Sequence, residues 1–275
     1  MHSRKAVREM NVMRIASYNL WNSDRGMPER GLHLVDTIKE VKPDIIGLQE
    51  VKNKAQFNYI EAELNMLHGV FFEHKGRVIE AEPWKENEGL AIFSNYQILD
   101  STYMEYAMFA LIDYSSTKIL VVNLHLPWDS VLAKEKCILA INREIMKYKS
   151  DFRFILGDFN CSENSSVHQF LKGDRSLNYE EVYHYWTDLA EVAEEFLDVP
   201  KESTINLKTN PRWGRRVLAD KSTRVDCIFM HDCFPNDYPI PKGFQYFGKC
   251  VNSDTNLCPS DHYGVCVDLQ MPKKK

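Results

Sequence analysis

The chain contains short apolar runs that end on a polar side chain. The runs are rich in Ile, Val, Leu and Phe and have the length of buried β-strands. A polar group at the end of a buried strand is costly unless it is paired or bound, so each ending suggests a use. The runs are MRIASYN, which ends at Asn19, DIIGLQE, which ends at Glu50, ILVVNLH, which ends at His125, and FILGDFN, which ends with Asp158 and Asn160.

Two further apolar runs have their polar residues at the start. RVDCIFM contains Asp226, and YGVCVDL directly follows the tripeptide SDH at residues 260–262. Side chains two residues apart on an extended chain point the same way, so Asp158 and Asn160 are expected to face one spot. If the strand ends converge, these acids, amides and imidazoles form one site.

Helical spacing separates the strands. Leu34, Ile38 and Val41 recur four and three residues apart before Pro43, which ends the predicted helix. Another helix is predicted over residues 54–67. A third follows Pro127 and has its apolar positions at Ile138, Ile141, Ile145 and Tyr148.

The middle of the chain predicts consecutive strands joined by short turns, which is typical of an antiparallel meander. Together with the β-α-β stretches, this favours two mixed sheets packed face to face with helices outside. The region 174–222 is polar without clean periodicity, and we expect short helices and long loops there, where specificity is usually set. The expected strands of the meander cover residues 89–95, 98–106, 108–114 and 117–124.

Composition is compatible with one large domain or two small ones. The 275 residues are 44% hydrophobic and 27% charged, which is ordinary for a globular protein. The formal net charge of −5 gives no electrostatic footprint for tight non-specific nucleic-acid binding, although a locally basic groove is compatible with it. We expect residues 1–11 to form a flexible N-terminal arm and residues 12–271 to form a single domain.

The cysteines and the N-terminus bear on the compartment. The seven cysteines are odd in number and contain no C-x-x-C pair, so a zinc site is not favoured. The N-terminus MHSRKAVREM is charged and lacks the apolar stretch of a signal peptide. No apolar run approaches the length of a membrane span. We therefore expect a soluble, cytoplasmic protein with reduced thiols.

The polar strand ends have the chemistry of a metal site. Glu50 and Asp261 supply hard oxygen ligands, which suit Mg²⁺, with Mn²⁺ as the alternative, because these ions keep waters and complete their shell from a phosphate. His125 and His262 would stand beside the metal and bind or protonate phosphoryl oxygens. The predicted site therefore binds a divalent cation and a phosphate ester.

Each of these residues also has a structural explanation on its own. Asp158 follows a glycine and could form an Asx turn. His125 could be a hydrogen-bonded core histidine, and Asp226 could pair with Arg224, which we expect to be structural. It is the number of polar strand ends taken together that favours a site. We expect no role in it for His33, His68, His74, His168, His184 and His231.

Taken in order, the motifs resemble those of the endonuclease/exonuclease/phosphatase superfamily. This superfamily includes pancreatic-type deoxyribonucleases, apurinic/apyrimidinic endonucleases, neutral sphingomyelinases and inositol-polyphosphate phosphatases. The resemblance implies an α/β fold, a four-layer α/β/β/α sandwich of two mixed β-sheets flanked by helices, with the site at one rim. The matching segments are YNLW, LQEV, EGLAIFS, VVNLHL, GDFN, RVDCIF and SDH, within residues 14 to 269.

The resemblance also implies a role for each polar residue. Glu50 is the primary metal ligand, Asn19 lies beside the metal, and Asp261 reaches the metal shell. Asp158 orients or deprotonates the attacking water, and Asn160 holds water and phosphate. Whether the general base is this acid or the histidine of SDH stays open. On the phosphate side, His125 contacts the scissile phosphate, His262 faces it, and Asp226 orients His262.

Substrate contacts are expected from more variable segments. NPRWGRR places Arg212, Trp213 and Arg215 where they could grip a phosphate and stack on a base, with a solvated loop around a buried tryptophan as an equal alternative. Trp128, which follows NLHLP, is a second candidate at the rim. Glu88, which precedes GLAIFS, is a further substrate-facing candidate.

The function predicted from the sequence is that of a Mg²⁺-dependent phosphoesterase that hydrolyses a phosphodiester by in-line attack of water, with an endo- or exonuclease as one form. Its partner is a phosphate-ester substrate, with nucleic acid as a candidate; no oligomeric state is predicted. One alternative is a phosphomonoesterase acting on a lipid head group, inositol or sugar phosphate. Ile155 and KSTRVD depart from the inositol-phosphatase pattern and weaken it. The other is a non-catalytic binding module on the same fold.

Overall fold

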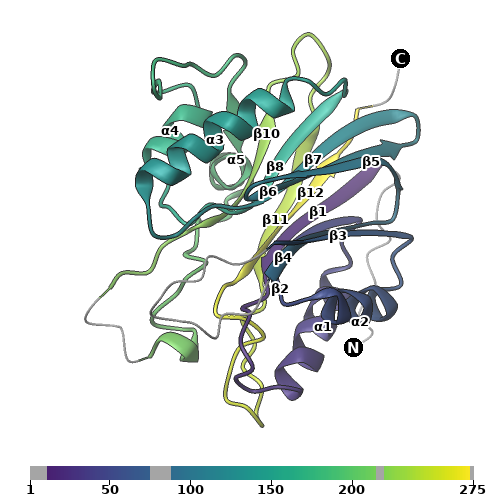
Figure 1. Ribbon diagram of the computed structural model, residues 1–275, viewed down its shortest axis with the longest axis vertical. Helices are drawn as coiled ribbons and strands as arrows, with labels where there is room; N and C mark the ends of the chain where they lie inside the picture. Colours follow the sequence, from purple (N-terminus) through teal and green to yellow (C-terminus); the bar gives the residue numbers. More distant parts are fainter. Residues whose placement is uncertain (1–10, 75–87, 215–219, 273–275) are drawn as a thin grey trace.

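Two β-sheets pack face to face, with helices on both outer sides (Figure 1). This computed structural model describes residues 11–74, 88–214 and 220–272. Each sheet comprises six strands of the described chain, and both parallel and antiparallel neighbours occur in each. The arrangement is the four-layer sandwich of two mixed sheets that the sequence predicted.

The first sheet consists of β1 (Val12–Asn19), β2 (Ile45–Val51), β3 (His68–His74), β4 (Glu88–Ser94), β11 (Ile240–Phe247) and β12 (Gly264–Gln270). Their order across the sheet is β11, β12, β1, β2, β4, β3. β1 runs parallel to β2, and the other neighbours are antiparallel. The central pair therefore ends at the same edge, with Asn19 and Glu50.

The second sheet consists of β5 (Gln97–Met104), β6 (Ala107–Tyr114), β7 (Thr117–His125), β8 (Phe152–Asp158), β9 (Trp186–Asp188) and β10 (Asp226–His231). Their order is β5, β6, β7, β8, β10, β9. β7 runs parallel to β8, with His125 beside Asp158, and β10 runs antiparallel with Asp226 beside Asp158. The polar ends of all three strands therefore lie at one edge.

Helices form the outer layers. α1 (Glu29–Val41) and α2 (Lys54–Leu64) cover the first sheet, whereas α3 (Val131–Ile145) and α4 (Ser166–Leu171) cover the second. α5 (Leu189–Leu197) packs against β10 and β11, one strand from each sheet. The region predicted to hold short helices and loops, 174–222, contains α5, the three-residue strand β9 and a 3₁₀ turn, η1 (Pro211–Trp213).

Capping residues set the ends of α2. The side chain of Asn53 accepts a hydrogen bond from the backbone N–H of Gln56 at 3.0 Å, which starts the helix. Asn65 adopts a left-handed conformation with φ of 50°, which ends it. The helix predicted over residues 54–67 is therefore confirmed but shorter.

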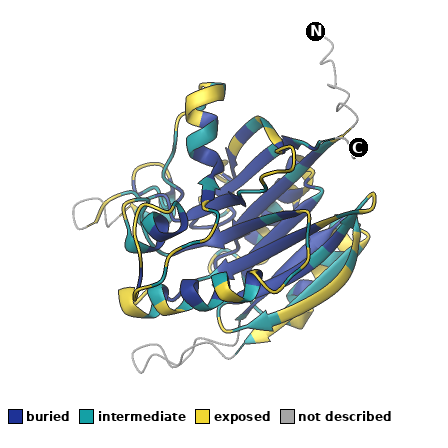
Figure 2. Cartoon of the chain, turned by 90° about the horizontal axis from the view of Figure 1, so that it is seen from above, coloured by how far each residue is buried: buried dark blue, intermediate teal, exposed yellow. Residues whose placement is uncertain are grey.

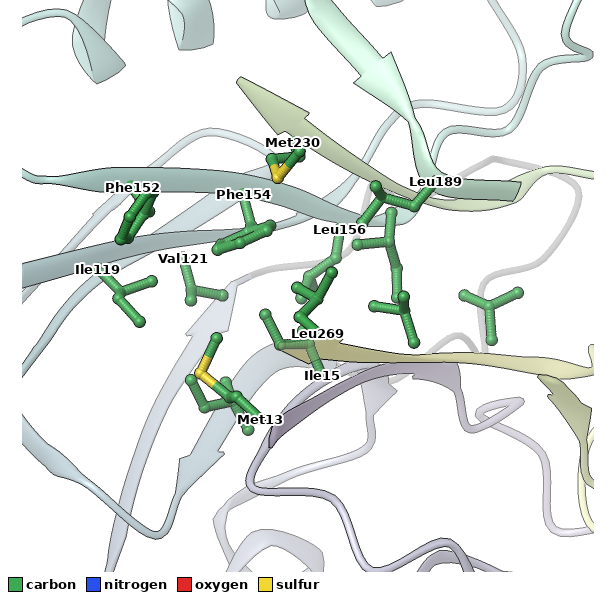
Figure 3. Packing of buried hydrophobic residues seen from close by; sticks show 14 of the residues in the cluster. Met13, Ile15, Ile119, Val121, Phe152, Phe154, Leu156, Leu189, Met230 and Leu269 are labelled. Carbon is green, nitrogen blue, oxygen red and sulfur yellow. The ribbon is translucent and has the colours of Figure 1, made fainter. Parts of the chain in front are cut away.

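Alternation along the strands sorts apolar side chains into layers. In β1, Met13 and Ile15 lie between the two sheets, whereas Ala16 and Tyr18 face α1 and α2. Figure 3 shows the layer between the sheets, into which Phe154 of β8 projects. The helices are buried on the side facing the sheets and exposed on the other (Figure 2). Three apolar layers thus hold the sandwich together.

A buried polar bridge joins the two sheets. Asn123 of β7 donates from Nδ2 to the carbonyl oxygens of Leu48 and Ala91 in the first sheet, at 2.9 Å each. Gln49 Nε2 donates to Asn123 Oδ1 at 2.6 Å. Gly47 leaves room for this bridge, because a Cβ at that position would lie 2.9 Å from Asn123 Cγ.

One predicted strand pairing is wrong. β5, β6 and β7 form the expected antiparallel meander, but β4 belongs to the other sheet. The connection after Ser94 crosses between the sheets, and Asn95 N donates to Asp44 O at 2.8 Å, which ties the crossing to the start of β2. Strand spacing alone does not distinguish a hairpin from such a crossing.

The predicted chain ends are only partly described. Of the expected arm, residues 1–11, the structure describes Asn11, whose carbonyl oxygen accepts a hydrogen bond from Met271 N at 3.0 Å. The single domain over residues 12–271 stays a prediction. Among the described residues, no helix is long and apolar enough to cross a membrane.

Candidate active site

Polar strand ends from both sheets meet at one rim of the sandwich. Asn19 of β1 donates from Nδ2 to Asp158 Oδ2 of β8 at 3.0 Å, a bond that joins one sheet to the other. The same Nδ2 donates to Glu50 Oε1 of β2 at 3.2 Å. Asn19 Oδ1 accepts a hydrogen bond from Trp21 N at 3.0 Å, so the amide nitrogen faces the two carboxylates. Asn19 therefore holds the two acids together.

Glu50 stands at a local irregularity of β2. The register between β2 and β4 shifts after Leu48, and Glu50 has a left-handed backbone with φ of 56°. Its Oε2 accepts a hydrogen bond from Asn22 N at 2.8 Å. Burial alone would raise the pKa of this carboxyl, but His125 and the Asn22 N–H outweigh it and hold the pKa below its usual value. Glu50 is thus set up as a carboxylate.

Asp158 is aimed by the glycine before it. Gly157 has φ of +137°, and a Cβ there would lie 2.0 Å from the carbonyl oxygen of Leu124, so this position needs glycine. Asp158 Oδ1 accepts a hydrogen bond from Asn160 N at 2.8 Å, which is the Asx turn weighed from the sequence. Burial raises the pKa of the Asp158 carboxyl, and His262 only partly offsets this. The Asp158 side chain therefore forms the Asx turn through Oδ1 and faces the site through Oδ2.

His262 lies between two carboxylates. Its Nδ1 is 2.9 Å from Asp226 Oδ2, and its Nε2 is 3.9 Å from Asp158 Oδ2. Thr204 Oγ1 accepts hydrogen bonds from the backbone N–H groups of Asp226 and Val225 at 3.1 Å and 3.0 Å, which fixes the start of β10. Burial would lower the pKa of the imidazole, but Asp226 and Asp158 outweigh it and raise the pKa well above its ordinary value.

His125 stands at the centre of the acidic strand ends rather than in the apolar core. Its Nε2 lies 3.6 Å from Asp158 Oδ2 and 3.9 Å from Glu50 Oε1. Its Nδ1 lies 3.9 Å from Glu88 Oε1, and Asn22 Nδ2 donates to Glu88 Oε2 at 3.4 Å. Glu88, suggested by the sequence as substrate-facing, is therefore part of the same group of side chains.

Asn160 is fixed against the loop that follows β7. Its Nδ2 donates to the carbonyl oxygen of Leu126 at 2.9 Å, and its own carbonyl oxygen accepts a hydrogen bond from Lys134 Nζ at 2.7 Å. The backbone is left-handed at Asn160, with φ of 48°. These contacts hold Asn160 next to Asp158 without using its side-chain oxygen.

Asp261 enters the site from the SDH segment before β12. Ser260 Oγ donates to the carbonyl oxygen of Asn19 at 2.7 Å, and Trp213 Nε1 donates to that of Asp261 at 2.8 Å. Burial raises the pKa of the Asp261 carboxyl to about 6; His262 opposes this shift, and the nearby Glu50 adds to it. The carboxylates of Asp261 and Glu50 therefore repel each other.

This donor set fits a hard divalent cation. Glu50 and Asp261 present carboxylate oxygens, the ligand type that Mg²⁺ prefers, and a cation between them would relieve their mutual repulsion. Asp158, Asp226 and His262 also have ligand atoms within 4.8 Å of one another. In that second group the short His262–Asp226 contact already pairs two of the three members, so the first pair is the better metal candidate.

Aromatic and cationic side chains lie beside Asp261. The guanidinium carbon of Arg212 is 5.3 Å from the ring centre of Trp21 and 5.0 Å from that of Trp213. Trp213 is half-buried, and its Nε1 bond to the carbonyl oxygen of Asp261 ties it to the SDH segment; a substrate contact by Arg212 and Trp213 stays a prediction. Arg215 lies outside the described residues.

The second rim aromatic is open to solvent. The side chain of Trp128 is 60% exposed, and so are Val131 and Leu132 in the first turn of α3, at 64% and 59%. Trp128 follows Leu126 by two residues, and the carbonyl oxygen of Leu126 accepts a hydrogen bond from the side-chain amide of Asn160. An exposed apolar surface therefore adjoins the polar site.

The sequence reasoning missed Arg30, which lies beneath the site. Arg30 is 3% exposed, and its guanidinium carbon is 4.5 Å from the ring centre of Trp21. It donates to five backbone carbonyls, those of Leu20, Trp21, Ser23, Arg25 and Pro259. A single arginine in a helical segment gives no sequence signal for this, because its partners come from loops.

Arg224 is structural, as expected, but its partners differ from the prediction. Its NH2 donates to Asp188 Oδ2 at 2.6 Å and to Glu163 Oε2 at 3.1 Å, whereas Asp226 bonds to His262. Asp188 also caps α5, by accepting from Ala190 N at 3.0 Å. The alternative of an Arg224–Asp226 pair is therefore not found: Arg224 lies before β10 begins at Asp226, and its guanidinium bonds to Asp188 and Glu163 instead.

Comparison with known proteins indicates the family of this chain. A sequence model described as the Endonuclease/Exonuclease/phosphatase family matches residues 16–262. Among curated proteins, the chain is similar to the probable CCR4-Not complex 3′-5′-exoribonuclease subunit Ccr4 of Vairimorpha ceranae (strain BRL01), with 28% identity over 178 residues. That match covers 50% of this chain and 37% of the curated protein, so most of the relative's length has no counterpart in it.

Solved structures share the fold at low identity. D. rerio TDP2 complexed with single strand DNA product has a TM-score of 0.71 at 17% identity, over 94% of this chain and 99% of that one. The endonuclease/exonuclease/phosphatase from Bacteroides vulgatus has a TM-score of 0.68 at 17% identity, over 95% of this chain and 99% of that one. Because the family's sequence model spans both sheets and ends at His262, the chain belongs to the endonuclease/exonuclease/phosphatase family.

Proposed function

We propose that this protein is a Mg²⁺-dependent phosphodiesterase that cleaves single-stranded nucleic acid by in-line attack of water. The observation that carries the proposal is the alignment of Asp226, His262 and Asp158 beside Glu50. An imidazole held by one carboxylate and facing another is the arrangement that fixes a tautomer and handles charge at a reacting phosphate. Mn²⁺ would serve as an alternative ion.

The metal site is assigned to Glu50 and Asp261, with Asn19 holding Glu50 in place. When bound, the cation supplies charge neutralisation at the phosphate oxygens. Asn19 donates to both Glu50 and Asp158, so it keeps the metal-binding acid and the acid opposite it at a fixed separation. The buried setting strengthens each of these electrostatic contacts.

Asp158 is the proposed general base. Despite burial, Asp226 and Asp158 raise the pKa of His262 well above its ordinary value, which favours this imidazole as a donor rather than an acceptor. His262 would then donate to a non-bridging phosphate oxygen from Nε2, while Asp226 balances its charge at Nδ1. This leaves Asp158 to aim the water and take its proton. His125 and Asn160 would bind further oxygens of the phosphate.

Single-stranded nucleic acid is the proposed substrate. The similar Ccr4 protein is named as a 3′-5′-exoribonuclease, and one structure with the same fold is described as a complex with single strand DNA product. In this chain the exposed Trp128 offers a stacking surface for a base. Arg212, between Trp21 and Trp213, offers a cation for a neighbouring phosphate, with Arg215 and Glu88 as further substrate contacts.

A non-catalytic binding module is the less favoured reading. Glu50, Asp158, Asp226 and His262 lie together at one rim, and an imidazole held by a carboxylate supports a catalyst over a passive phosphate pocket. A phosphomonoesterase is less favoured for a different reason. An exposed apolar surface around Trp128 suits a substrate that extends well beyond the phosphate.

The proposal is tested by turnover. Bis-p-nitrophenyl phosphate and p-nitrophenyl phosphate are compared first, each with Mg²⁺ and with excess chelator. Single-stranded RNA and DNA oligonucleotides labelled at the 5′ end are then compared with duplexes. Hydrolysis of the diester and of single strands, abolished by chelator, supports the proposal. Hydrolysis of the monoester alone contradicts it, and no turnover of any substrate favours the binding module.

The state of the cysteines bears on the compartment of the protein. The seven cysteines all lie in the described ranges and form no disulfide. Reduced thiols are typical of proteins from a reducing compartment. We therefore infer a cytoplasmic location, which fractionation of cells expressing the tagged chain would check.

A further inference from the structure

Arg30 is a buried cation whose donors are all used on backbone. Its side chain is 3% exposed, and each of its five N–H groups lies within hydrogen-bond distance of a carbonyl oxygen, from 2.5 Å to 3.1 Å. A buried charge is costly unless it is compensated, and here five carbonyl dipoles compensate it together with the nearby Asp261 carboxylate. Because every donor of the Arg30 side chain bonds to a backbone carbonyl, Arg30 restricts the conformation of the segments that supply those carbonyls.

The carbonyls belong to two segments that adjoin the proposed metal ligands. Four of them lie in the loop of residues 20–25, and the fifth is that of Pro259, next to the SDH segment. The loop supplies Asn22 N, which donates to Glu50 Oε2 at 2.8 Å. Pro259 is two residues before Asp261 in the chain. One guanidinium therefore ties the support of Glu50 to the segment of Asp261.

The same loop sets the orientation of Asn19. Trp21 N donates to Asn19 Oδ1 at 3.0 Å, which turns the amide nitrogen toward Glu50 and Asp158. Trp21 has a left-handed backbone with φ of 56°, a conformation that a tryptophan adopts only under constraint. Its carbonyl oxygen accepts from Arg30 NH2 at 3.1 Å, and its ring covers the guanidinium. Arg30 supplies that constraint.

We propose that Arg30 is the positioning residue of the metal site: through the loop of residues 20–25 and Pro259 it presets the separation of Glu50 and Asp261 for one divalent cation. The proposal rests on the proposed function, because it concerns the same metal ligands. Arg30 acts through backbone, because all five of its side-chain N–H groups are used on carbonyl oxygens. We therefore expect its main effect to be on metal affinity.

Lysine cannot replace this arginine. An ammonium group offers three donors from one point, whereas the guanidinium reaches five carbonyls in a planar fork. Arg30→Lys keeps the charge and the approximate volume but releases part of the loop. The expected result is a Mg²⁺ dissociation constant at least 10-fold weaker, with kcat at saturating Mg²⁺ within about 3-fold of the original.

The test measures binding of Mg²⁺ and Mn²⁺ by calorimetry on the full chain, without substrate, together with hydrogen exchange at the Asn22 amide. Arg14→Lys is the matched control. Arg14 also donates from its side chain to a carbonyl, that of Val41 at 2.6 Å, and pairs with Asp268 at 2.6 Å, but it lies at the opposite end of β1. We expect Arg30→Lys to weaken metal binding and speed Asn22 exchange, and Arg14→Lys to do neither.

The possible outcomes distinguish the role of Arg30 from the proposed metal-dependent function. Equal metal affinity in Arg30→Lys and the original protein would overturn the role of Arg30 while leaving the metal site intact. No metal binding by the original protein would overturn the proposed function itself. If Arg30→Lys does not fold, Arg30→Gln, which keeps two donors, takes its place. Should that variant bind Mg²⁺ normally, the role of Arg30 is excluded.

Discussion

Nδ1 of His262 lies 2.9 Å from Oδ2 of Asp226, and both side chains are buried. The partners come from opposite sheets: Asp226 starts β10, and His262 precedes β12. Because this contact uses Nδ1, the other ring nitrogen is left to face Asp158. The pair therefore fixes both the direction and the charge of the imidazole.

Asp226→Asn should remove the charge behind the imidazole while keeping its shape. The amide can hold the ring but does not stabilise its protonated form, so we expect kcat to fall by about 10²- to 10⁴-fold, the range of general acid–base effects. The measurement is kcat on bis-p-nitrophenyl phosphate at saturating Mg²⁺. If kcat falls by less than about 3-fold, His262 works without a charged partner.

Asp158→Asn should lower kcat by several orders of magnitude with little loss of stability. Asparagine still offers an oxygen to Asn160 N, so the turn is preserved, but it cannot take a proton from water. Single-turnover kinetics and thermal unfolding check both halves of this prediction. Near-normal turnover in a folded variant would remove Asp158 from the proposed mechanism.

Glu50→Gln should raise the Mg²⁺ concentration needed for half-maximal activity by at least about 10-fold. The amide keeps an oxygen but loses the charge that a hard cation needs. A Mg²⁺ titration of activity, repeated with Mn²⁺, is the measurement. If the titration curve is unchanged, Glu50 is not the metal ligand and Asp158 or Asp226 becomes the candidate.

Stability should fall in acid because of a histidine outside the site. Burial lowers the pKa of His168 to about 4 from 6.5, so the folded protein holds it neutral. Below pH 6.5 the unfolded chain binds a proton that the folded chain does not. The stabilising contribution is thus complete above pH 6.5 and is lost as the pH falls toward 4, roughly 3 kcal/mol in all.

His168→Leu tests this by removing the titrating group. Urea unfolding at pH 7 and at pH 4.5 gives the loss of unfolding free energy for each protein. We expect the variant to lose less than the original, whatever its absolute stability at pH 7. His231, whose pKa burial also lowers to about 4, remains in both proteins, so part of the acid loss will persist. Equal losses would contradict the assignment.

Trp128→Ala should weaken binding of single strands. Stacking of a base on an aromatic ring contributes about 1–3 kcal/mol, so KM should rise about 5- to 160-fold for an oligonucleotide. An oligonucleotide lacking the base beside the cleaved bond should show no such change. Phe234→Ala is the control, since Phe234 is 71% exposed but follows β10 at the end away from Asp226. Equal effects of both variants would exclude stacking at Trp128.

Much of the fold could be predicted because most strands are buried on both faces and read as apolar runs. β3 was missed because it is an edge strand: no residue of it is fully buried, and HGVFFEH shows no long apolar run. β11 was missed because Pro241 and Gly243 interrupt its pattern, and the register shifts between them. The crossing after Ser94 was read as a hairpin because both connections are equally short.

The site was predictable to the extent that its residues sit at strand ends. Glu50, Asp158 and His125 each close a recognisable apolar run, and topology brings such ends together. Arg30 was not predictable, because its role depends on carbonyls in a loop that has no sequence pattern. The pairing of Arg224 with Asp188 was not predictable, because Asp188 lies far along the chain and is brought near by the pairing of β9 with β10.

The amide of Asn123 has a consequence for the rim, several residues away. Glu50 and Asp158 belong to different sheets, so their spacing depends on how the two layers are registered against each other. Asn123 pins one layer to the other through the carbonyls of Leu48 and Ala91, and Leu48 is two residues before Glu50 in the same strand. Any slip between the layers would have to break both bonds in the buried interior, where an unpaired amide or carbonyl is costly. The fold thereby protects the spacing of its reactive acids from within.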